Sequence, residues 1–214
     1  MADPQESLLA RWGALVERLG LDAGAAHTAI AELFVAHREP ARRYHDLCHL
    51  AECFELVDAM VDLAPGDRDA AEVALWFHDV VYDPTAKDNE HRSALRADAF
   101  LRNAGRPDLA PQVAEAIEMT AGHAPVTRTP VIDAVHDADL GILGASPERY
   151  DEYAHAIRHE YAHIGDDDFR DGRARVLRSF LAMRHIYIRP DMAEREITAR
   201  RNLEREVRAL ATAR

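Results

Sequence analysis

Residues 71–84 read AEVALWFHDVVYDP, and the rest of the chain is interpreted outward from this stretch. On a helix of about 100° per residue, its apolar residues cover nearly the whole circumference: Val73, Ala74, Leu75, Trp76, Phe77, Val80 and Val81. A helix that is apolar on all sides belongs in the middle of a globular core. Yet this one carries His78 and Asp79 side by side. A carboxylate removed from water needs a partner, and a metal ion is one of the few adequate ones.

The composition is that of a soluble globular protein. Of the 214 residues, 48% are apolar and 30% are charged, which is enough for one ample core. The net charge of −12 argues against binding to a nucleic-acid polymer, which requires a basic surface. A small anionic substrate remains compatible, because a metal ion or a few arginines can dominate one pocket. No run of apolar residues approaches the ~20 that a membrane-spanning helix needs. The N-terminus has no signal-peptide pattern. The sequence therefore predicts a cytoplasmic protein without membrane contacts.

Helical periodicity recurs along the whole chain, and no stretch alternates convincingly with period two. Turn and breaker residues separate roughly nine or ten segments of helical length. Several segments follow a capping residue, as with Ser146 before Pro147 and Asp88 before Asn89. No repeat or flexible linker interrupts them. We therefore predict an all-α fold in a single helical domain of residues 1–214, with a metal-site core over about 44–140 and C-terminal helices over 146–212 packing on it.

Residues 43–61, RYHDLCHLAECFELVDAMV, place histidines on the core side of a second helix. His45 and His49 are four residues apart and share one side of it. His49 lies inside the apolar sector and His45 at its edge. A buried histidine is usually bonded to a backbone carbonyl, so His49 is a candidate ligand only if another element supplies partners.

Residues 129–144, TPVIDAVHDADLGILG, supply a possible partner for His49. In helical projection Asp139 lies among apolar residues, while Asp133 and Asp137 face away from them. An aspartate on the core face needs a partner, whereas one on the outer face does not. A third histidine pattern, at positions 155, 159 and 163, lies opposite the apolar side of its segment and is interpreted as a solvent-exposed face.

Together His49, His78, Asp79 and Asp139 form a mixed nitrogen and oxygen ligand set suited to a divalent transition metal. Their order resembles the HD superfamily of metal-dependent phosphohydrolases. RYHDLCH resembles a segment of cyclic-nucleotide phosphodiesterases, FHDVVYD is similar to the His-Asp segment of guanosine-tetraphosphate hydrolases, and DADLGIL resembles the segment that carries the last ligand in both. Residues 157–187 and 199–206 look like a small bacterial family of predicted HD phosphohydrolases. The resemblance implies an all-α fold and a divalent transition-metal ion (Mn, Fe, Co, Ni or Zn) bound by these four residues.

The number of metal ions stays open. Two-metal members of the superfamily use further histidines between the His-Asp pair and the final aspartate. Here His91 and His123 are available, and His123 is the better placed by spacing. An ordinary loop histidine is an equally good interpretation of His123. Where the tetraphosphate hydrolases have a Glu-Asp pair, this chain has Tyr82-Asp83, so only one acid remains there.

The resulting hypothesis is hydrolysis of a nucleotide or another small phosphoester. The ion would polarise a phosphoryl oxygen and lower the pKa of a water molecule, and His45 or Asp83 would handle the proton. The candidates that would bind the phosphate are Lys87, Arg92, Arg158 and Arg173.

Two alternative hypotheses assign the chain to other functional classes. One is a mixed-valent di-iron oxygenase on the same fold, which would need His123 or His91 as a real ligand. The other is a non-catalytic module that binds a metal or a nucleotide. A homodimer is compatible with the sequence. The sequence specifies neither the oligomeric state nor the substrate.

Overall fold

The computed structural model describes residues 4–124 and 126–212. Every regular element in this part of the chain is helical, with ten α-helices, two 3-10 helices and no strand. The prediction of an all-α bundle of nine or ten helices is therefore confirmed. The chain forms two compact units, Met1–Asp139 (unit 1) and Leu140–Arg214 (unit 2). Each helix within the described ranges is too short or too polar to cross a membrane.

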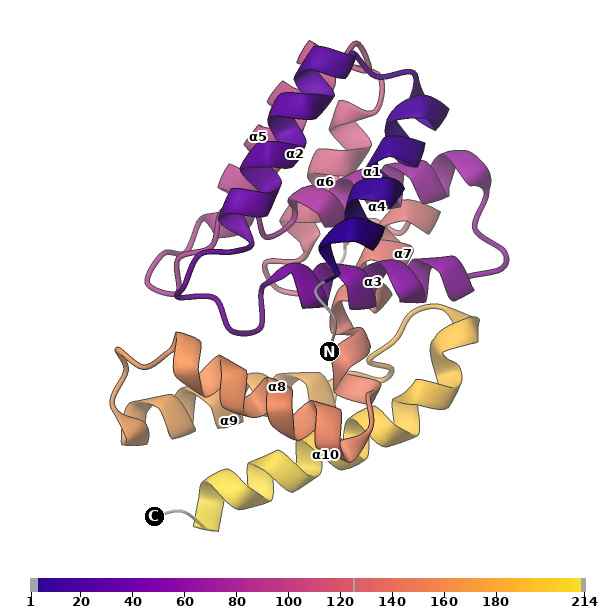
Figure 1. The fold of residues 1–214 in the computed structure, drawn as a ribbon. Helices are drawn as coiled ribbons and strands as arrows, with labels where there is room; N and C mark the ends of the chain where they lie inside the picture. The colour runs from indigo at the N-terminus through magenta and orange to yellow at the C-terminus, as the bar shows by residue number, and fades with distance from the viewer. Residues whose placement is uncertain (1–3, 125, 213–214) are drawn as a thin grey trace. The chain divides into compact units, whose positions relative to one another are not determined.

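Unit 1 is built around one central helix, α4 (Pro65–Phe77), which packs against five others. The other helices of the unit are α1 (Gln5–Leu19), α2 (Ala23–Ala36), α3 (Leu47–Ala59), α5 (Asn89–Asn103), α6 (Ala110–Met119) and α7 (Pro130–Asp139) (Figure 1). Pro65 is pre-organised for the first turn of α4, and Asp67 lies near the positive end of the helix dipole. All eight residues from Ala70 to Phe77 are buried; the apolar pattern predicts this for residues 73–77, whereas the burial of Glu72 was not predicted.

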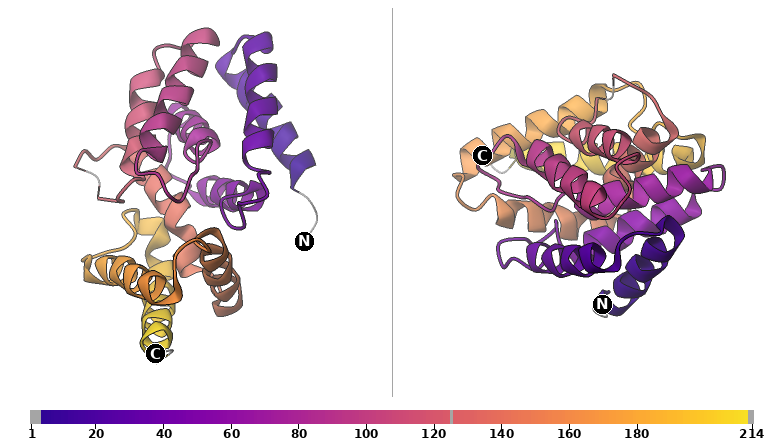
Figure 2. Two further views of the ribbon diagram at one scale, coloured as in Figure 1. Left: turned by 90° about the vertical axis from the view of Figure 1, so that its left-hand side faces the viewer. Right: turned by 90° about the horizontal axis from the view of Figure 1, so that it is seen from above.

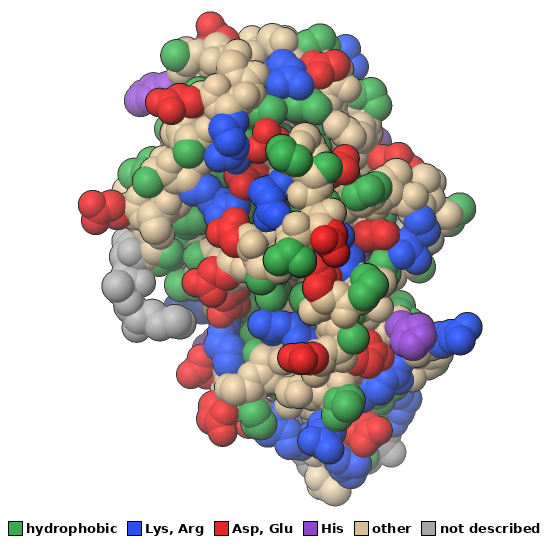
Figure 3. Space-filling view, turned by 90° about the vertical axis from the view of Figure 1, so that its right-hand side faces the viewer, with side chains coloured by type: hydrophobic (Ala, Val, Ile, Leu, Met, Phe, Trp, Pro, Cys, Tyr) green, Lys and Arg blue, Asp and Glu red, His purple; other side chains and the backbone are tan. Residues whose placement is uncertain are grey.

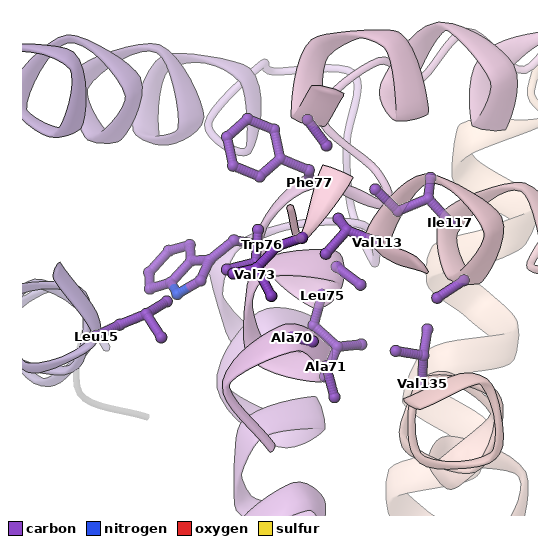
Figure 4. Packing of buried hydrophobic residues seen from close by; sticks show 14 of the residues in the cluster. Leu15, Ala70, Ala71, Val73, Leu75, Trp76, Phe77, Val113, Ile117 and Val135 are labelled. Carbon is purple, nitrogen blue, oxygen red and sulfur yellow. The ribbon is translucent and has the colours of Figure 1, made fainter. Parts of the chain in front are cut away.

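The side chains of α4 point in several directions into the core (Figure 4). Trp76 extends toward Leu15 of α1, whereas Leu75 points toward Val113 and Val135 on α6 and α7. The Trp76 ring also meets Trp12 edge to face, with centroids 5.3 Å apart. Contacts on all sides hold the C-terminal end of α4, where His78 and Asp79 follow, in a fixed position.

The helix ends earlier than the apolar stretch suggests. The sequence predicted that it continues through Val81, but α4 stops at Phe77 and His78 is its C-cap residue. Side chains from elsewhere satisfy the backbone beyond this point: the Arg42 guanidinium donates to the carbonyls of Asp79 and Val80, and Ser93 Oγ accepts from the Val81 amide. Because these bonds replace helical ones, the His-Asp pair lies at a helix end rather than inside a helix.

Unit 2 contains η1 (Leu140–Gly144), α8 (Pro147–Glu160), α9 (Asp166–Ala182), η2 (Pro190–Met192) and α10 (Ala193–Thr212) (Figure 2). Helix α10 packs on α9 and on η1. Ser146 caps α8 by accepting a hydrogen bond from the Arg149 amide, as predicted. The histidines at positions 155, 159 and 163 are exposed, which also confirms their interpretation as a solvent-exposed face.

Acidic and basic side chains are interspersed on the face drawn in Figure 3. The surface of the units carries exposed ion pairs, such as Arg102 with Asp98 and Arg96 with Glu32. Exposed pairs of this kind contribute little to stability, because water and salt screen them. The stability of the units therefore depends mainly on burial of apolar residues.

Gly144 gives the first testable prediction. A Cβ atom at this position would lie 2.8 Å from Arg195 Cβ, 2.8 Å from Tyr187 Oη and 3.0 Å from the Arg195 carbonyl oxygen. The backbone of α10 cannot move away without disturbing the rest of unit 2. We expect Gly144→Ala to lower the free energy of unfolding by about 1–3 kcal/mol. Urea unfolding checks this, with Gly172→Ala as the control, because no atom lies within 4 Å of a Cβ added there.

Candidate metal centre

Four residues from three helices of unit 1 converge on one point. His49 lies in the first turn of α3, His78 and Asp79 follow α4, and Asp139 ends α7. The two histidine Nε2 atoms are 3.1 Å apart. Asp79 Oδ2 lies 3.1 Å from His78 Nε2 and 3.7 Å from His49 Nε2. Asp139 Oδ1 lies 3.2 Å from His49 Nε2 and 3.5 Å from His78 Nε2. The structure thus brings together all four of the predicted ligands.

These separations suit a transition-metal ion. Ligand atoms about 2.1 Å from an ion, at angles between tetrahedral and octahedral values, lie roughly 3.0–3.4 Å from one another. The side chains of His49 and His78 are each 1% exposed, and those of Asp79 and Asp139 are 16% and 15% exposed. The set is therefore shielded from bulk water, with the two carboxylates on its more open side.

The end of α4 determines which His78 nitrogen faces the cluster. His78 Nδ1 lies 2.8 Å from the Leu75 carbonyl oxygen, one of the carbonyls that a helix end leaves without an amide partner. Nδ1 must carry the proton in this bond, so Nε2 of the neutral ring presents a lone pair to the cluster. A backbone bond of this kind is the usual way in which a metal-binding histidine is oriented.

The start of α3 positions His49 and corrects one prediction. Asp46 is the N-cap residue, and its carboxylate accepts from the amides of Cys48 and His49. The helix consequently begins at Leu47, so His45 precedes it and does not share its face with His49 as predicted. The His45 ring instead stacks on Tyr82, with centroids 4.2 Å apart, and lies 5.9 Å from the His49 ring. His45 is thus half-buried beside the cluster.

The electrostatics of the cluster favour a cation. Burial alone would lower the pKa of His78, but Asp79 and Asp139 outweigh it and raise that pKa well above its ordinary value. Burial would likewise raise the pKa of Asp79 and of Asp139, but neighbouring histidines, His78 foremost, lower both. Asp79 Oδ2 is buried, and its close polar contact is His78 Nε2 at 3.1 Å. The donor set therefore fits a divalent ion, which would displace the proton from His78.

Arg42 is a further residue of the site that the sequence did not reveal. Its side chain is 1% exposed, and its Nη1 donates to the carbonyl oxygens of Asp79 at 2.5 Å and His45 at 3.3 Å. It thereby ties the turn after α4 to the turn before α3. In the sequence it stands next to Arg43, which is exposed, and nothing in the pattern separates the two.

Asp137 contradicts the helical projection. It was predicted to face away from the core, but it is fully buried, and its Oδ1 lies 2.9 Å from Nδ1 of the buried His136. Helix α7 packs against α3, α4 and α6, so it has no broad outer face. The small stability change that a surface aspartate would show on replacement is no longer expected for Asp137.

The remaining candidates of unit 1 are half-buried, as His123 is, or exposed. His123 Nε2 lies 3.3 Å from Asp139 Oδ2, whereas His91 pairs with Glu118 in the open. Asp83 is exposed, and its carboxylate accepts hydrogen bonds from the Thr85 amide and hydroxyl. The other two, Lys87 and Arg92, are exposed. Their roles in binding phosphate stay predictions.

Arg158 and Arg173 belong to unit 2 and are engaged there. Arg158 donates to the carbonyls of Tyr161 and Ile164 and to Asp166. Arg173 Nε donates to Glu206 at 2.8 Å, and both of these side chains are largely buried. These bonds give the two arginines structural roles within unit 2, and their role as phosphate ligands stays a prediction.

Comparisons of this chain with protein-family models, with curated proteins and with solved structures found no match.

His37 gives a second prediction. It caps α2, is 1% exposed, and donates from Nδ1 to the Leu33 carbonyl. Burial lowers the pKa of His37 to about 3. The unfolded chain binds a proton there below about pH 6.5, and the folded chain does not, so this residue's contribution to stability is lost as the pH falls from 6.5 toward 3. Between pH 7 and pH 5 the loss is about 2 kcal/mol.

We expect His37→Gln to remove this part of the pH dependence. The glutamine amide does not titrate and can still donate a hydrogen bond. Urea unfolding of the metal-free wild type and variant at pH 7 and pH 5 gives the free energy of unfolding that each protein loses between the two pH values. The loss should be smaller in the variant. Equal losses in the two proteins would contradict the prediction.

Proposed function

We propose that this chain is a metal-dependent phosphohydrolase acting on a nucleotide or another small phosphoester. The observation that carries the proposal is the convergence of two buried imidazole nitrogens, 3.1 Å apart, with one oxygen each of Asp79 and Asp139, which lie 3.1–3.7 Å from these nitrogens. Two buried carboxylates require a cation among them; without metal a proton on His78 supplies the positive charge, and a divalent ion would take its place. The order of the four residues in the sequence, which resembles the HD superfamily, supports the same proposal.

The residues that would hold the ion are His49, His78, Asp79 and Asp139. A divalent ion in this set supplies Lewis acidity toward a phosphoryl group and toward water. The chain's own residues do the rest. His78 is held by the Leu75 carbonyl, and Arg42 fixes the backbone of Asp79, so the ligands need little reorganisation.

Of the two candidates for proton transfer, His45 has the better support. Its ring is half-buried beside His49, and its positive form lowers the pKa of Asp79, which reflects its closeness to the cluster. Asp83 is exposed and committed to Thr85. We therefore propose that His45 carries the proton for the water or the leaving group.

A two-step experiment tests the proposal. Elemental analysis of untagged protein should find at least one divalent transition-metal ion per chain, or one that Mn²⁺, Fe²⁺, Co²⁺ or Ni²⁺ restores after chelation. The metal-loaded protein should then hydrolyse a member of a panel of nucleotides and small phosphoesters. Failure to bind any of these metals would overturn the proposal, and metal binding without turnover would leave the metal- or nucleotide-binding module as the better interpretation.

A second ion, which the di-iron oxygenase alternative requires, is supported by one specific observation. The two oxygens of Asp139 face different histidines, Oδ1 toward His49 and Oδ2 toward His123. A carboxylate with this arrangement is able to bridge two ions. Two irons per chain, together with dioxygen consumption on a diol or phosphonate, would support the oxygenase over the phosphohydrolase.

A further inference from the structure

A second buried His-Asp pair lies next to the metal centre and has no place among its ligands. His136 and Asp137 are adjacent residues of α7 and are 2% and 0% exposed. His136 Nδ1 lies 2.9 Å from Asp137 Oδ1. A carboxylate with no exposure to water requires a partner of this kind, and the imidazole of His136 provides it.

The other nitrogen of His136 reaches the turn before α7. His136 Nε2 lies 3.3 Å from the backbone carbonyl oxygen of His123, and the two imidazole rings meet edge to face with centroids 5.3 Å apart. Since the carbonyl can only accept, Nε2 donates in this bond. His136 thus links the buried carboxylate of Asp137 to the backbone at His123.

His123 has an unusual backbone conformation. With φ of 48° it is the one residue other than glycine in the left-handed region within residues 4–124 and 126–212. This region is unfavourable for a residue with a side chain, so the surrounding contacts must hold it there. The bond from His136 acts on the carbonyl of this same residue.

The conformation directs the His123 ring at a metal ligand. His123 Nε2 lies 3.3 Å from Asp139 Oδ2, while Asp139 Oδ1 lies 3.2 Å from His49 Nε2. One oxygen of Asp139 therefore faces the metal centre, and the other is held by His123. Rotation of the Asp139 carboxylate would break both contacts.

We propose that His136 and Asp137 are positioning residues that hold His123 in its left-handed turn and, through His123, fix Asp139 for the metal ion. Neither residue touches the ion. The proposal rests on the proposed function only in taking the four-residue cluster as a metal site. It holds whether His123 donates a hydrogen bond to Asp139 or binds a second ion.

The test compares two replacements of His136 by titrating metal-free protein with Co²⁺ and following the Co²⁺ absorption spectrum. His136→Leu cannot donate to the His123 carbonyl, and we expect it to weaken Co²⁺ binding by roughly 10-fold, the lower end of the range for loss of an outer partner of a metal ligand, because His136 acts on Asp139 through His123. His136→Gln keeps an amide donor and should recover most of that loss. Asp133→Asn, a change on the same helix at a residue paired with Arg128, is the control and should bind Co²⁺ like wild type.

A second background shows whether the effect passes through His123. Glycine adopts the left-handed conformation without strain and carries no ring. In His123→Gly protein, adding His136→Leu should therefore weaken Co²⁺ binding little further. An equally large effect in both backgrounds would mean that His136 acts by general packing, and would overturn the proposal.

The remaining outcomes are also decisive. A wild-type protein that binds no Co²⁺ would overturn the proposed function as well, whereas wild-type and His136→Leu proteins of equal affinity would overturn this inference alone. If His136→Leu does not fold, His123→Gly alone carries the test: unchanged Co²⁺ affinity would show that His123 does not position Asp139.

Discussion

His78→Ala and Asp79→Asn proteins are expected to bind a divalent transition metal more than roughly 100-fold more weakly than wild type, since each loses a direct ligand and loss of an outer partner alone costs 10–100-fold. Phosphoester hydrolysis should fall to background in both, because the ion would supply most of the catalysis. Metal content after dialysis and turnover on the best substrate of the panel measure the two effects. Far-ultraviolet circular dichroism checks that the helices are retained.

Matched controls separate loss of the site from loss of the fold. His91→Gln replaces an exposed histidine paired with Glu118, and Asp133→Asn replaces an aspartate paired with Arg128. Both should keep wild-type metal content and turnover, because surface changes of this kind are usually small. The site assignment would be wrong if His78→Ala kept its metal, or if either control lost it.

The four predicted ligands were accessible from the sequence because each stands where an apolar pattern should exclude a charge. His78 and Asp79 follow a run of eight buried residues, and His49 and Asp139 fall inside apolar sectors of their own helices. A buried polar side chain in such a place requires a partner, and the structure brings all four together. The pattern therefore carried information about the site as well as the fold.

The failures have a different origin. Projection of a single helix assumes one outer face, and α7 has none, since three helices surround it and bury Asp137. His45 was assigned to α3 because the capping signal of Asp46, which is local and readable from the sequence, was not used to set the start of the helix. Long-range partners, by contrast, are invisible in the sequence. Arg42 meets the carbonyls that follow α4, and Arg173 meets Glu206, 33 residues away.

A buried ion network between α1 and α4 gives the last prediction. The Glu72 side chain is 3% exposed and accepts from two arginines of α1, with Arg11 Nη2 2.6 Å from Oε1 and Arg18 Nη2 2.9 Å from Oε2. Arg11 is 19% exposed and also pairs with Asp58, whereas Arg18 is 42% exposed and also pairs with Asp69. Glu72 is thus the buried member on which both guanidinium groups converge.

We expect Glu72→Gln to lower the free energy of unfolding by about 1.5–3 kcal/mol, the range for hydrogen bonds to charged groups. The larger cost of stranding a buried charge does not apply, because both arginines keep a second acidic partner and Arg18 remains well hydrated. Urea unfolding at neutral pH measures the change. Glu32→Gln is the matched control, because Glu32 and its partner Arg96 are about equally exposed, at 60% and 61%, and an exposed pair contributes less than about 1 kcal/mol. Equal losses in the two variants would show that burial of Glu72 gives its ion pairs no added strength.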